Sequence, residues 1–396
     1  MHRKHPSSQE KHLSFVSTQV KLLVQPDDGI KPLLAAINKA KESIRILIFR
    51  FDRFEIQKAL VAAVERGVTV QALIAYTNRG EEKNLRKLEM QLLERGITVS
   101  RTSNDLVRYH GKMMIVDDKE LYLFAYNYTH MDIDLSRSFG AAIKTASTVK
   151  EAIELFEADA HRVAFKSKSK NSGLVISPVN ARERLTDFIR KAKKRLYIYE
   201  MKISDAEFIR LLQKKISEGV EVRVLSRASS KSDILPVRKI AMRLHARVIL
   251  RDSESAFIGS QSLRKLELEA RREIGVIFKD TKVVHQIERV FMRDWKKSEP
   301  IVPENAMEAA FDVPAKKVAK ELAKKISVKP VIERVLDRVM DIREDAPFEP
   351  DEVVQTVRDA VRQEVHEAVA EALRNLALDC IGTVPDDPGP EKGKKG

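Results

Sequence analysis

The sequence predicts an α/β protein built from two repeats with central sheets, followed by an α-helical C-terminal extension. Two observations carry this prediction: an internal duplication and, within each copy, strands that alternate with helices of 10–15 residues. A third is the length of 396 residues, which exceeds one small domain. The hydrophobic fraction of 43%, with 33% charged residues, is typical of a folded chain and excludes disordered and collagen-like classes.

The duplication appears as an ungapped alignment of two segments that lie 152 residues apart. Across residues 37–74, 11 of 38 positions are identical to their partners at 189–226, far more than unrelated segments share. A second alignment holds later in each copy at an offset of 135, where His110, Asp117 and Gly140 recur as His245, Asp252 and Gly275. The offset falls by 17 because the first copy carries a longer connection around residues 76–87.

Each copy follows the same order of elements. A helix precedes a β-rich run, and an amphipathic helix and a glycine precede a second β-run. The helices are expected at 31–41, 54–66, 182–194 and 205–218, and the strands at 44–51, 68–75, 196–203 and 220–226. Strands that alternate with helices of this length favour a sheet in the middle of each copy.

Composition divides the chain further. Residues 166–173 are polar and rich in Lys and Ser, as expected for a flexible linker between the copies. Beyond residue 300, apolar residues at spacings of three and four predict helices that pack on the chain's own repeats or contact an oligomer or partner. The expected parts are an N-terminal tail (1–19), repeat one (20–165), the linker (166–173), repeat two (174–300), a helical extension (301–380) and a disordered tail (381–396).

The charge of the chain indicates an acidic partner. The sequence has 72 Lys and Arg against 58 Asp and Glu, which gives a net charge of +14. The excess lies on residues 1–300, which carry +19, whereas residues 301–396 carry −5. A basic body suits nucleic acid and an anionic membrane surface equally well.

The sequence also bears on the compartment. The single cysteine, Cys380, excludes an internal disulfide framework. No apolar stretch of signal-peptide length occurs before Lys21, and no apolar run of about 18 residues occurs later, so neither a signal peptide nor a membrane-spanning helix is expected. We therefore expect a cytoplasmic protein whose contact with a membrane, where one exists, is peripheral.

Each repeat carries one group of residues suited to phosphate chemistry. A histidine is followed two residues later by a cation and five residues after that by an aspartate. Residues i and i+2 of a strand share a face, so the imidazole and the cation can meet one phosphate. The aspartates lie at an odd spacing from the histidines, which favours a structural role over direct chemistry. The groups are His110, Lys112 and Asp117 in the first repeat and His245, Arg247 and Asp252 in the second.

These motifs resemble those of the phospholipase D superfamily, in which H-x-K-x(4)-D occurs once in each of two α/β repeats. The segments 108–117, 256–263 and 273–276 are also similar to the family's motif, turn and following strand. The resemblance covers residues 20–300, about three quarters of the chain. It implies two pseudo-symmetric repeats with mixed central sheets and one cleft between them that holds both motifs.

The resemblance also implies a covalent mechanism that needs no metal or other cofactor. One histidine attacks phosphorus and expels an alcohol, which the other histidine protonates. Water or a second alcohol then resolves the phosphohistidine. His110 is implied as nucleophile and His245 as general acid, an order that the symmetry of the motifs leaves open. The residues implied to bind phosphate are Lys112, Asn127, Arg247 and Ser260, with Glu273 as an orienting residue.

Three departures from the family pattern bear on activity. Arg247 replaces lysine, which keeps the charge and changes the donor geometry. The first turn keeps only Asn127, whereas the second loses its asparagine and keeps Ser260. Ser138 stands where the second repeat has Glu273, so we expect one side of the site to lack an orienting carboxylate.

Three functions fit these observations. The leading hypothesis is a phospholipase D-like phosphodiesterase that hydrolyses or exchanges a phospholipid head group, with cardiolipin-synthase-like exchange as one branch. The second is a nuclease or other nucleic-acid phosphodiesterase of the same superfamily, because the positive charge suits it equally well. The third is a degenerate phosphate-binding module that anchors on acidic lipid or DNA while the C-terminal helices recruit a partner.

Overall fold

The computed structural model describes residues 20–76, 82–167, 172–227 and 235–300. All of these belong to one unit that spans Met1–Ile301, and this unit contains both repeats. The expected N-terminal tail, helical extension and C-terminal tail lie outside the described residues.

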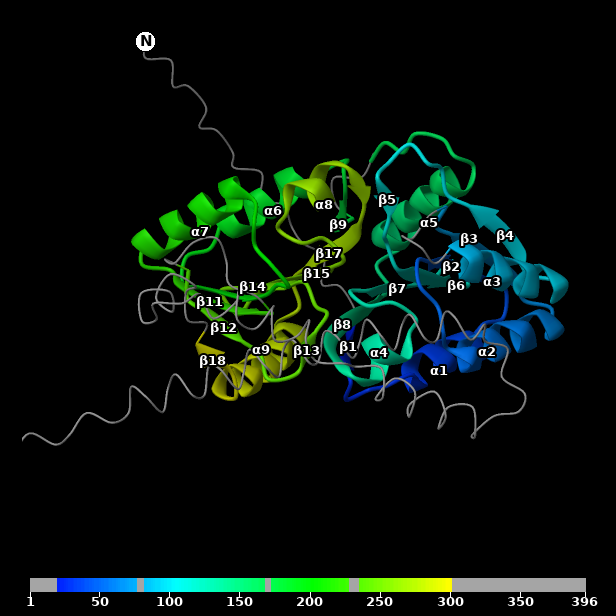
Figure 1. Cartoon of the computed structure of the whole chain (residues 1–396), viewed down its shortest axis with the longest axis horizontal. Coiled ribbons are helices and arrows are strands. Elements are labelled where there is room, and N and C mark those ends of the chain that lie inside the picture. The colour runs from blue at the N-terminus through cyan, green and yellow to red at the C-terminus, as the bar shows by residue number, and fades with distance from the viewer. Residues whose placement is uncertain (1–19, 77–81, 168–171, 228–234, 301–396) are drawn as a thin grey trace, which may run out of the picture. The chain divides into compact units, whose positions relative to one another are not determined.

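The first repeat is a mixed sheet with helices packed against it (Figure 1). Its strands are β1 (Val20–Gln25), β2 (Ser43–Ile48), β3 (Thr69–Ile74), β4 (Thr98–Arg101), β6 (Met113–Val116), β7 (Glu120–Phe124) and β8 (Ser136–Ile143), and its helices are α1 (Lys31–Lys39), α2 (Phe54–Glu65), α3 (Glu82–Glu94), α4 (His130–Asp134) and α5 (Ala146–Ala160). The strand order is β1-β8-β7-β6-β2-β3-β4. β2, β3 and β4 run parallel, and the other strands are added antiparallel beside β2.

The second repeat has a similar order of strands, with β18 (Glu299–Pro300) added beside β12 (Val237–Lys239) at one edge of its sheet. Its strands are β9 (Leu174–Ile176), β10 (Arg195–Tyr199), β11 (Glu221–Ser226), β12 (Val237–Lys239), β14 (Val248–Arg251), β15 (Ser255–Gly259), β17 (Ile274–Phe278) and β18 (Glu299–Pro300), and its helices are α6 (Ala181–Arg190), α7 (Ala206–Ser217), α8 (Lys265–Glu269) and α9 (Thr281–Lys296). The strand order is β18-β12-β11-β10-β14-β15-β17-β9. The predicted pair of α/β repeats with mixed sheets is therefore confirmed.

The elements form where the local sequence favours them. The side chain of Asp205 accepts the amides of Glu207 and Phe208 and so caps α7, and Asp280 caps α9 in the same way. The predicted helices and strands are present, with ends that differ by a few residues from the expected ranges. The longer connection of the first repeat contains α3, which leads into β4.

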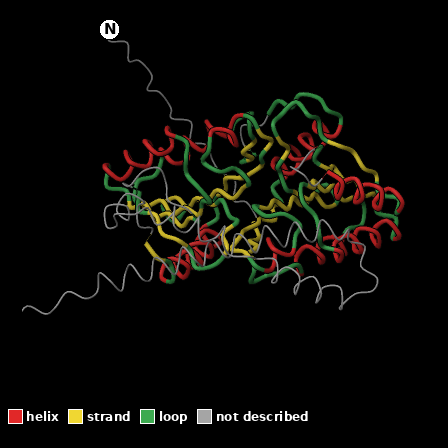
Figure 2. The backbone as a smooth tube through the Cα atoms, viewed as in Figure 1, coloured by secondary structure: helices red, strands yellow, loops and turns green. Residues whose placement is uncertain are grey.

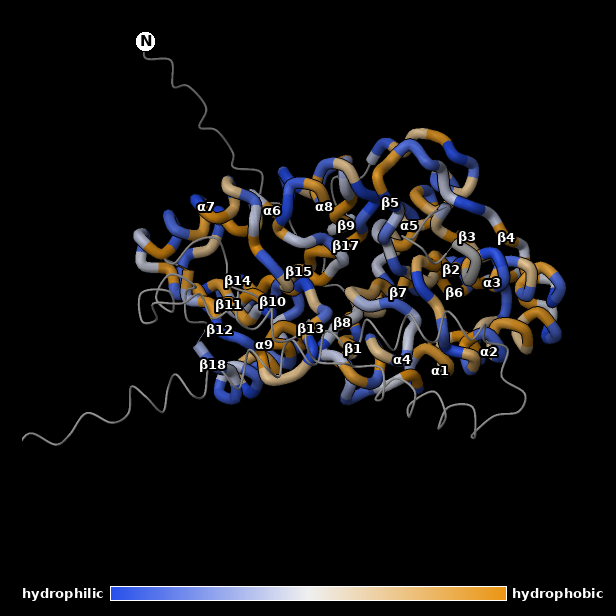
Figure 3. The backbone as a smooth tube through the Cα atoms, in the orientation of Figure 1, coloured by the Kyte–Doolittle hydropathy of each residue, from blue (hydrophilic) through white to orange (hydrophobic). Residues whose placement is uncertain are grey.

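Helices cover the outside of each sheet and bury one face. In Figure 2 the strands run through the middle of each repeat and the helices lie outside them. Helix α9 alternates between orange and blue in Figure 3, because its apolar residues lie on one side of the helix. The buried residues on that side include Val284, Ile287 and Phe291.

One hydrophobic core is shared by the two repeats. It contains Leu123 and Phe139 from the first sheet together with Ile258 and Phe291 from the second repeat, all fully or almost fully buried. Two further clusters fill the remaining face of each sheet. Phe291 of the second repeat therefore packs against residues of the first. The end of the expected linker is also buried, since Ser172 lies against Glu151.

Two buried ion pairs cross from one repeat to the other at equivalent positions. Arg137 of β8 donates to Asp294 of α9 at 2.7 Å. Arg272, which lies 135 residues later, donates to Asp159 of α5, with Nε 3.1 Å from the nearer carboxylate oxygen. Each arginine also donates to a backbone carbonyl, that of Gln25 or Ser177. A buried guanidinium needs such partners, and here the docking of the repeats supplies them.

Candidate active site

Each motif histidine follows a two-residue strand that pairs with the opposite repeat. Strand β5 (Arg108–Tyr109) pairs with β16 (Arg271–Arg272), and β13 (Arg243–Leu244) pairs with β8. The backbone amide of His110 then donates to the Arg272 carbonyl at 2.7 Å, and that of His245 donates to the Arg137 carbonyl at 3.0 Å. The backbone of one repeat therefore holds the histidine of the other.

His110 is enclosed by groups from both repeats. Its Nδ1 lies 2.9 Å from Oε2 of Glu273, and its ring packs edge-on against Phe49 at a centroid distance of 4.4 Å. Lys112 Nζ lies 2.9 Å from each ring nitrogen. Burial, followed by the charges of Lys112 and Arg247, holds the pKa of His110 well below its usual value. The imidazole is therefore neutral near pH 7.

The residue between His110 and Lys112 is glycine for a steric reason. A Cβ at Gly111 would lie 2.5 Å from Cδ1 of Ile274 and 3.0 Å from Cδ2 of Leu47. The second repeat has Ala246 at the equivalent place, where the side chain is buried without such a conflict. The glycine allows β17 of the second repeat to approach the first motif closely.

His245 has a carboxylate partner, contrary to the expectation from the sequence. Ser138 does replace Glu273 at the equivalent position, and its hydroxyl donates to the carbonyl of His245 at 2.6 Å. The carboxylate comes instead from Asp132 of α4, whose Oδ2 lies 3.1 Å from Nδ1 of His245 without the alignment of a hydrogen bond. Arg243 also donates to Asp132, at 2.7 Å.

The environment of His245 differs electrostatically from that of His110. Burial lowers the pKa of His245 to about 4, against the opposing effect of Asp132. Burial alone would raise the pKa of Asp132, but its contacts with His245, Asn127 and Arg243 outweigh burial and lower that pKa. Asp132 is thus a charged carboxylate, whereas burial raises the pKa of Glu273.

The two motif cations are buried and differ in what holds them. Lys112 is fully buried, and burial lowers its pKa to about 7, although Glu273 opposes this effect. Arg247 is 5% exposed and donates from Nε to the hydroxyl of Ser262 at 3.1 Å. An arginine stays charged at every pH relevant to proteins. The site therefore combines one titratable cation with one permanent cation.

The polar turn residues divide into two groups. Asn127 donates from its backbone and side-chain amides to Asp132, at 2.9 and 2.7 Å, which leaves its Oδ1 without a partner. Ser260 is turned to the backbone of Ile274, whose amide it accepts at 3.0 Å. Ser262, the equivalent of Asn127 at the offset of 135, is the serine that contacts a motif cation. Ser262, and not Ser260, therefore lies against a motif cation.

The two motif aspartates lie outside this cluster, where each accepts backbone amides. Asp117 accepts the backbone amides of Lys41, Glu42 and Ser43 at 2.7–3.1 Å. Asp252 accepts the three equivalent amides in the second repeat at 2.7–3.2 Å; they belong to Lys193, Lys194 and Arg195. Both aspartates have a positive φ, 53° and 55°. Each ties the end of its own strand, β6 or β14, to the turn that leads into the neighbouring strand, β2 or β10.

Several buried polar atoms of the cluster have no hydrogen-bond partner. They are Oδ1 of Asn127, Nδ1 of His245, Nη1 of Arg247 and Oε1 of Glu273. Such atoms are costly when they remain unsatisfied, and together they provide donors and acceptors for a polar ligand. In the part of the chain that the structure describes, no group of three or more His, Cys, Asp or Glu side chains could hold a metal ion.

Sequence reasoning missed three acidic residues near the motifs. Asp132 and Glu267 lie five residues after Asn127 and Ser262 and occupy equivalent places on α4 and α8. The offset of 135 links this acidic pair and could have revealed it. Glu200 has no acidic equivalent; it accepts the amide of Leu263 at 3.1 Å, and burial raises its pKa to about 7.

Comparison with known proteins places the chain in a family. The family described as "Cardiolipin synthase, PLD-like domain" matches residues 33–160 and 185–295, which is more than half of the chain. The chain therefore belongs to this PLD-like domain family, within the phospholipase D superfamily. The resemblance inferred from the two motifs is confirmed.

Curated relatives and solved structures agree with this assignment. Cardiolipin synthase 1 of Bacillus cereus is 25% identical over 346 residues, covering 72% of this chain and 68% of that protein. The Bacillus anthracis protein of the same name is 24% identical over the same coverage. Phosphatidylserine synthase of Haemophilus influenzae shares the fold with a TM-score of 0.57 at 12% identity, covering 77% of this chain and 93% of that one. Polyphosphate kinase of Porphyromonas gingivalis has a TM-score of 0.58 at 18% identity, covering 69% and 50%.

Proposed function

We propose that this protein cleaves or exchanges the phosphodiester of a phospholipid head group through a phosphohistidine intermediate. The observation that supports the chemistry is the crossed arrangement of the two motifs. Each histidine is held by the other repeat, and the two motif cations influence the pKa values of both histidines. One phosphodiester can therefore contact both halves of the site.

The first step forms a bond between His110 and phosphorus. Nδ1 of His110 faces Glu273, so the lone pair of Nε2 attacks phosphorus while the bond to the leaving alcohol oxygen breaks. His245 gives its proton to that oxygen. In the second step, water or an acceptor alcohol returns a proton to His245 and attacks phosphorus, and the nitrogen–phosphorus bond breaks. This sequence splits one difficult displacement into two easier ones.

The assignment of the two histidines rests on their carboxylate partners. His110 is neutral, which a nucleophile must be. Its neighbour Glu273 has a raised pKa. His245 is next to Asp132, whose pKa is lowered and whose charge favours the imidazolium. A bound phosphodiester adds negative charge that offsets Lys112 and Arg247, and this raises the pKa of His245 toward the value that a general acid needs.

The phosphate oxygens have a set of donors in the cluster. Lys112 and Arg247 supply positive charge, and Nη1 of Arg247 has no partner in the protein. Ser262 holds Nε of Arg247 and so fixes the direction of its guanidinium. Fixed charges in a site with little water stabilise the charge that develops on phosphate oxygens.

A rim of exposed apolar residues beside the site supports lipid over nucleic acid. Met131 lies on α4 next to Asp132, and Leu135 directly follows this helix. Met242 precedes Arg243, whose backbone lies opposite that of Ser136. Val107 and Leu266 occupy the equivalent places in the other half, where the amide of Val107 donates to Ala270 at 3.0 Å. These five side chains are 37–60% exposed and alternate with cations such as Arg108 and Lys265. Apolar and basic residues together suit an anionic lipid surface.

The proposal is tested by comparing substrates and rim variants. Phosphatidylglycerol vesicles and double-stranded DNA are incubated separately with the full chain. Release or exchange of the head group with intact DNA supports the proposal, whereas cut DNA with intact lipid replaces it with a nuclease. Met131→Ser combined with Leu266→Ser should lower turnover on vesicles about tenfold and leave a monomeric short-chain phospholipid unaffected.

The matched control lies on α3, away from the motifs. Met90 and Leu93 are 57% and 46% exposed, so Met90→Ser with Leu93→Ser removes similar apolar surface. This variant should retain wild-type turnover on vesicles. Equal losses in both pairs would show that the rim has no special role.

Within the described ranges we find no helix with both the length and the apolar character needed to span a bilayer.

A further inference from the structure

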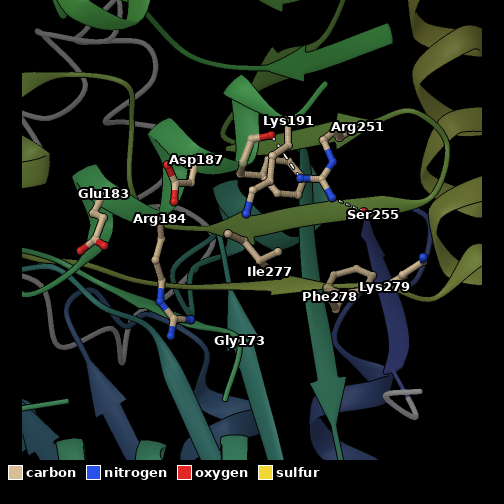
Figure 4. Close-up of a pocket in the computed structure, with 11 residues that line it drawn as sticks. Gly173, Glu183, Arg184, Asp187, Lys191, Arg251, Ser255, Ile277, Phe278 and Lys279 are labelled. Carbon is tan, nitrogen blue, oxygen red and sulfur yellow. Dashed lines mark hydrogen bonds between the residues drawn. The ribbon is translucent and has the colours of Figure 1, made fainter. Parts of the chain in front are cut away.

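A cationic pocket lies at the end of the second sheet that is remote from the histidines. Its volume is about 190 Å³, and it is formed between α6 and the strands β14, β15 and β17 (Figure 4). Four cationic side chains line it: Arg184, Lys191, Arg251 and Lys279. The catalytic residues Arg247 and Glu273 directly precede β14 and β17, whereas Arg251 and Lys279 lie at the opposite ends of these strands. The pocket is therefore separate from the active site.

The first repeat shows what the equivalent place contains when it is filled. Glu120 begins β7 and lies opposite Val116 of β6. Its carboxylate accepts a hydrogen bond from Lys39 and lies 4.0 Å from Nζ of Lys144. One internal carboxylate thus neutralises a lysine from the helix and a lysine from the neighbouring strand end.

The second repeat keeps the cations and loses the carboxylate. Ser255 replaces Glu120 at the offset of 135, while the two lysines recur as Lys191 and Lys279. Arg251, which replaces the apolar Val116, pairs directly with Ser255 across β14 and β15. Ala256 pairs with Phe278, so the next register step places Lys279 opposite Ser255. Three positive side chains surround a position where the first repeat has a negative one.

Among the described residues, no carboxylate takes the place of Glu120 between these cations. The guanidinium of Arg251 donates to Ser255 Oγ at 3.0 Å and to the Phe188 carbonyl at 3.3 Å, and it stacks on the Phe188 ring, as Figure 4 shows in part. Within the described part of the chain, the ion-pair partner of Lys279 is the exposed Glu254, at 3.9 Å. Lys191 has no ion-pair partner among the described residues.

The acidic residues on α6 do not replace Glu120. Asp187 also lines the pocket, and its carboxylate accepts a hydrogen bond from Arg190 at 2.7 Å on the exposed side of α6. Glu183 is exposed and lies one turn further from Lys191 along the helix. Neither residue projects from the strand that bears Ser255.

We propose that this pocket binds a small oxyanion carrying a phosphate group, which takes the place of the missing carboxylate. A phosphate offers several acceptor oxygens, and a guanidinium with two amines suits it. The phosphate group comes from one of two sources: inorganic phosphate in solution or the phosphate of an anionic lipid head group. This site is independent of the function proposed for the histidine cluster.

The test replaces the anion by a side chain. Ser255→Glu restores the carboxylate of the first repeat, and Ser255→Gln is its neutral control of nearly the same size. In phosphate-free buffer, Ser255→Glu should raise the melting temperature of the full chain by about 2–4 °C relative to Ser255→Gln. Inorganic phosphate should stabilise the wild type, and Ser255→Glu should need at least about tenfold more phosphate for the same shift.

The reciprocal change in the first repeat provides an internal control. Glu120→Ser should leave Lys39 and Lys144 without a carboxylate there and increase the stabilisation that phosphate produces. To separate the two sources, the same proteins are mixed with vesicles of phosphatidylglycerol. A response to phosphate alone identifies the free ion, and weaker vesicle binding by Ser255→Glu without a response to phosphate identifies the lipid head group. Equal behaviour of Ser255→Glu and Ser255→Gln in all of these measurements would overturn the proposal.

Discussion

The two repeats have kept the same framework while their functional positions have diverged. Both retain the aspartate that ties strand to turn, Asp117 or Asp252, and the arginine that crosses to the other repeat, Arg137 or Arg272. At the active site, lysine and a neutral histidine in one repeat face arginine and a histidine paired with a charged carboxylate in the other. The framework must serve both copies equally, whereas the reaction proposed above needs two different halves.

Removing either histidine tests this division most severely. His110→Ala and His245→Ala should each lower turnover about 1,000-fold or more. With an aryl phosphodiester, whose leaving group needs no proton, His245→Ala should still form the phosphohistidine and His110→Ala should not. Mass spectrometry of the quenched protein measures the label. Phosphate found on His245 in the wild type would reverse the roles of the two repeats.

The crossing ion pairs should differ in strength. Breaking a buried pair leaves an uncompensated charge and typically costs about 3–5 kcal/mol of unfolding free energy. Asp294→Ala should cost more than Asp159→Ala, because Asp294 also accepts the hydroxyl of Tyr199 at 2.7 Å. Urea unfolding of both variants measures the difference, and Tyr199→Phe should account for about 1 kcal/mol of it. A larger loss in Asp159→Ala would contradict this comparison.

The two motif cations should respond differently to pH. The pKa of Lys112, about 7, means that the substrate-free site loses this charge as the pH rises, whereas Arg247 remains charged. Above pH 7, kcat/KM should therefore fall by up to about tenfold per pH unit, and Lys112→Arg should extend the plateau to higher pH. An identical alkaline limb in this variant would assign the titration to another group.

The same lysine has a predictable effect on stability. Its folded pKa lies below the unfolded value, so the unfolded chain binds the extra proton between about pH 7 and 10.4. Within this window, its contribution makes the free energy of unfolding increase with pH. Lys112→Met should flatten that slope in chemical denaturation measured at several pH values, and Arg247→Met should not.

The turn aspartates should give the smallest effects, and equal ones. Asp117→Ala and Asp252→Ala each remove an acceptor for three backbone amides, which should lower the free energy of unfolding by about 1 kcal/mol. Turnover per folded molecule should stay within about twofold of the wild type. Asp117→Asn keeps an acceptor oxygen and serves as the control. A loss of turnover without a loss of stability would instead assign these aspartates a part in the reaction.

Much of the fold and the motif positions could be predicted because their determinants are local or repeated. Hydrophobic periodicity placed the first helices and strands of each repeat, and duplication made the two short H-x-K/R patterns informative. The odd spacing of Asp117 and Asp252 correctly separated them from the face that bears the histidines. Such signals depend on residues close together in the chain.

The sequence alone therefore determined the two α/β repeats, the family and the histidine–cation pairs. Only the tertiary structure decided which carboxylate serves which histidine, because the pairings of β5 with β16 and of β13 with β8 join residues more than 100 positions apart. The same holds for the shared core and for the surroundings of Ser255, where the register of three strands and one helix brings the cations together. Contacts of this kind depend on how whole sheets dock, which a local pattern of residues does not encode.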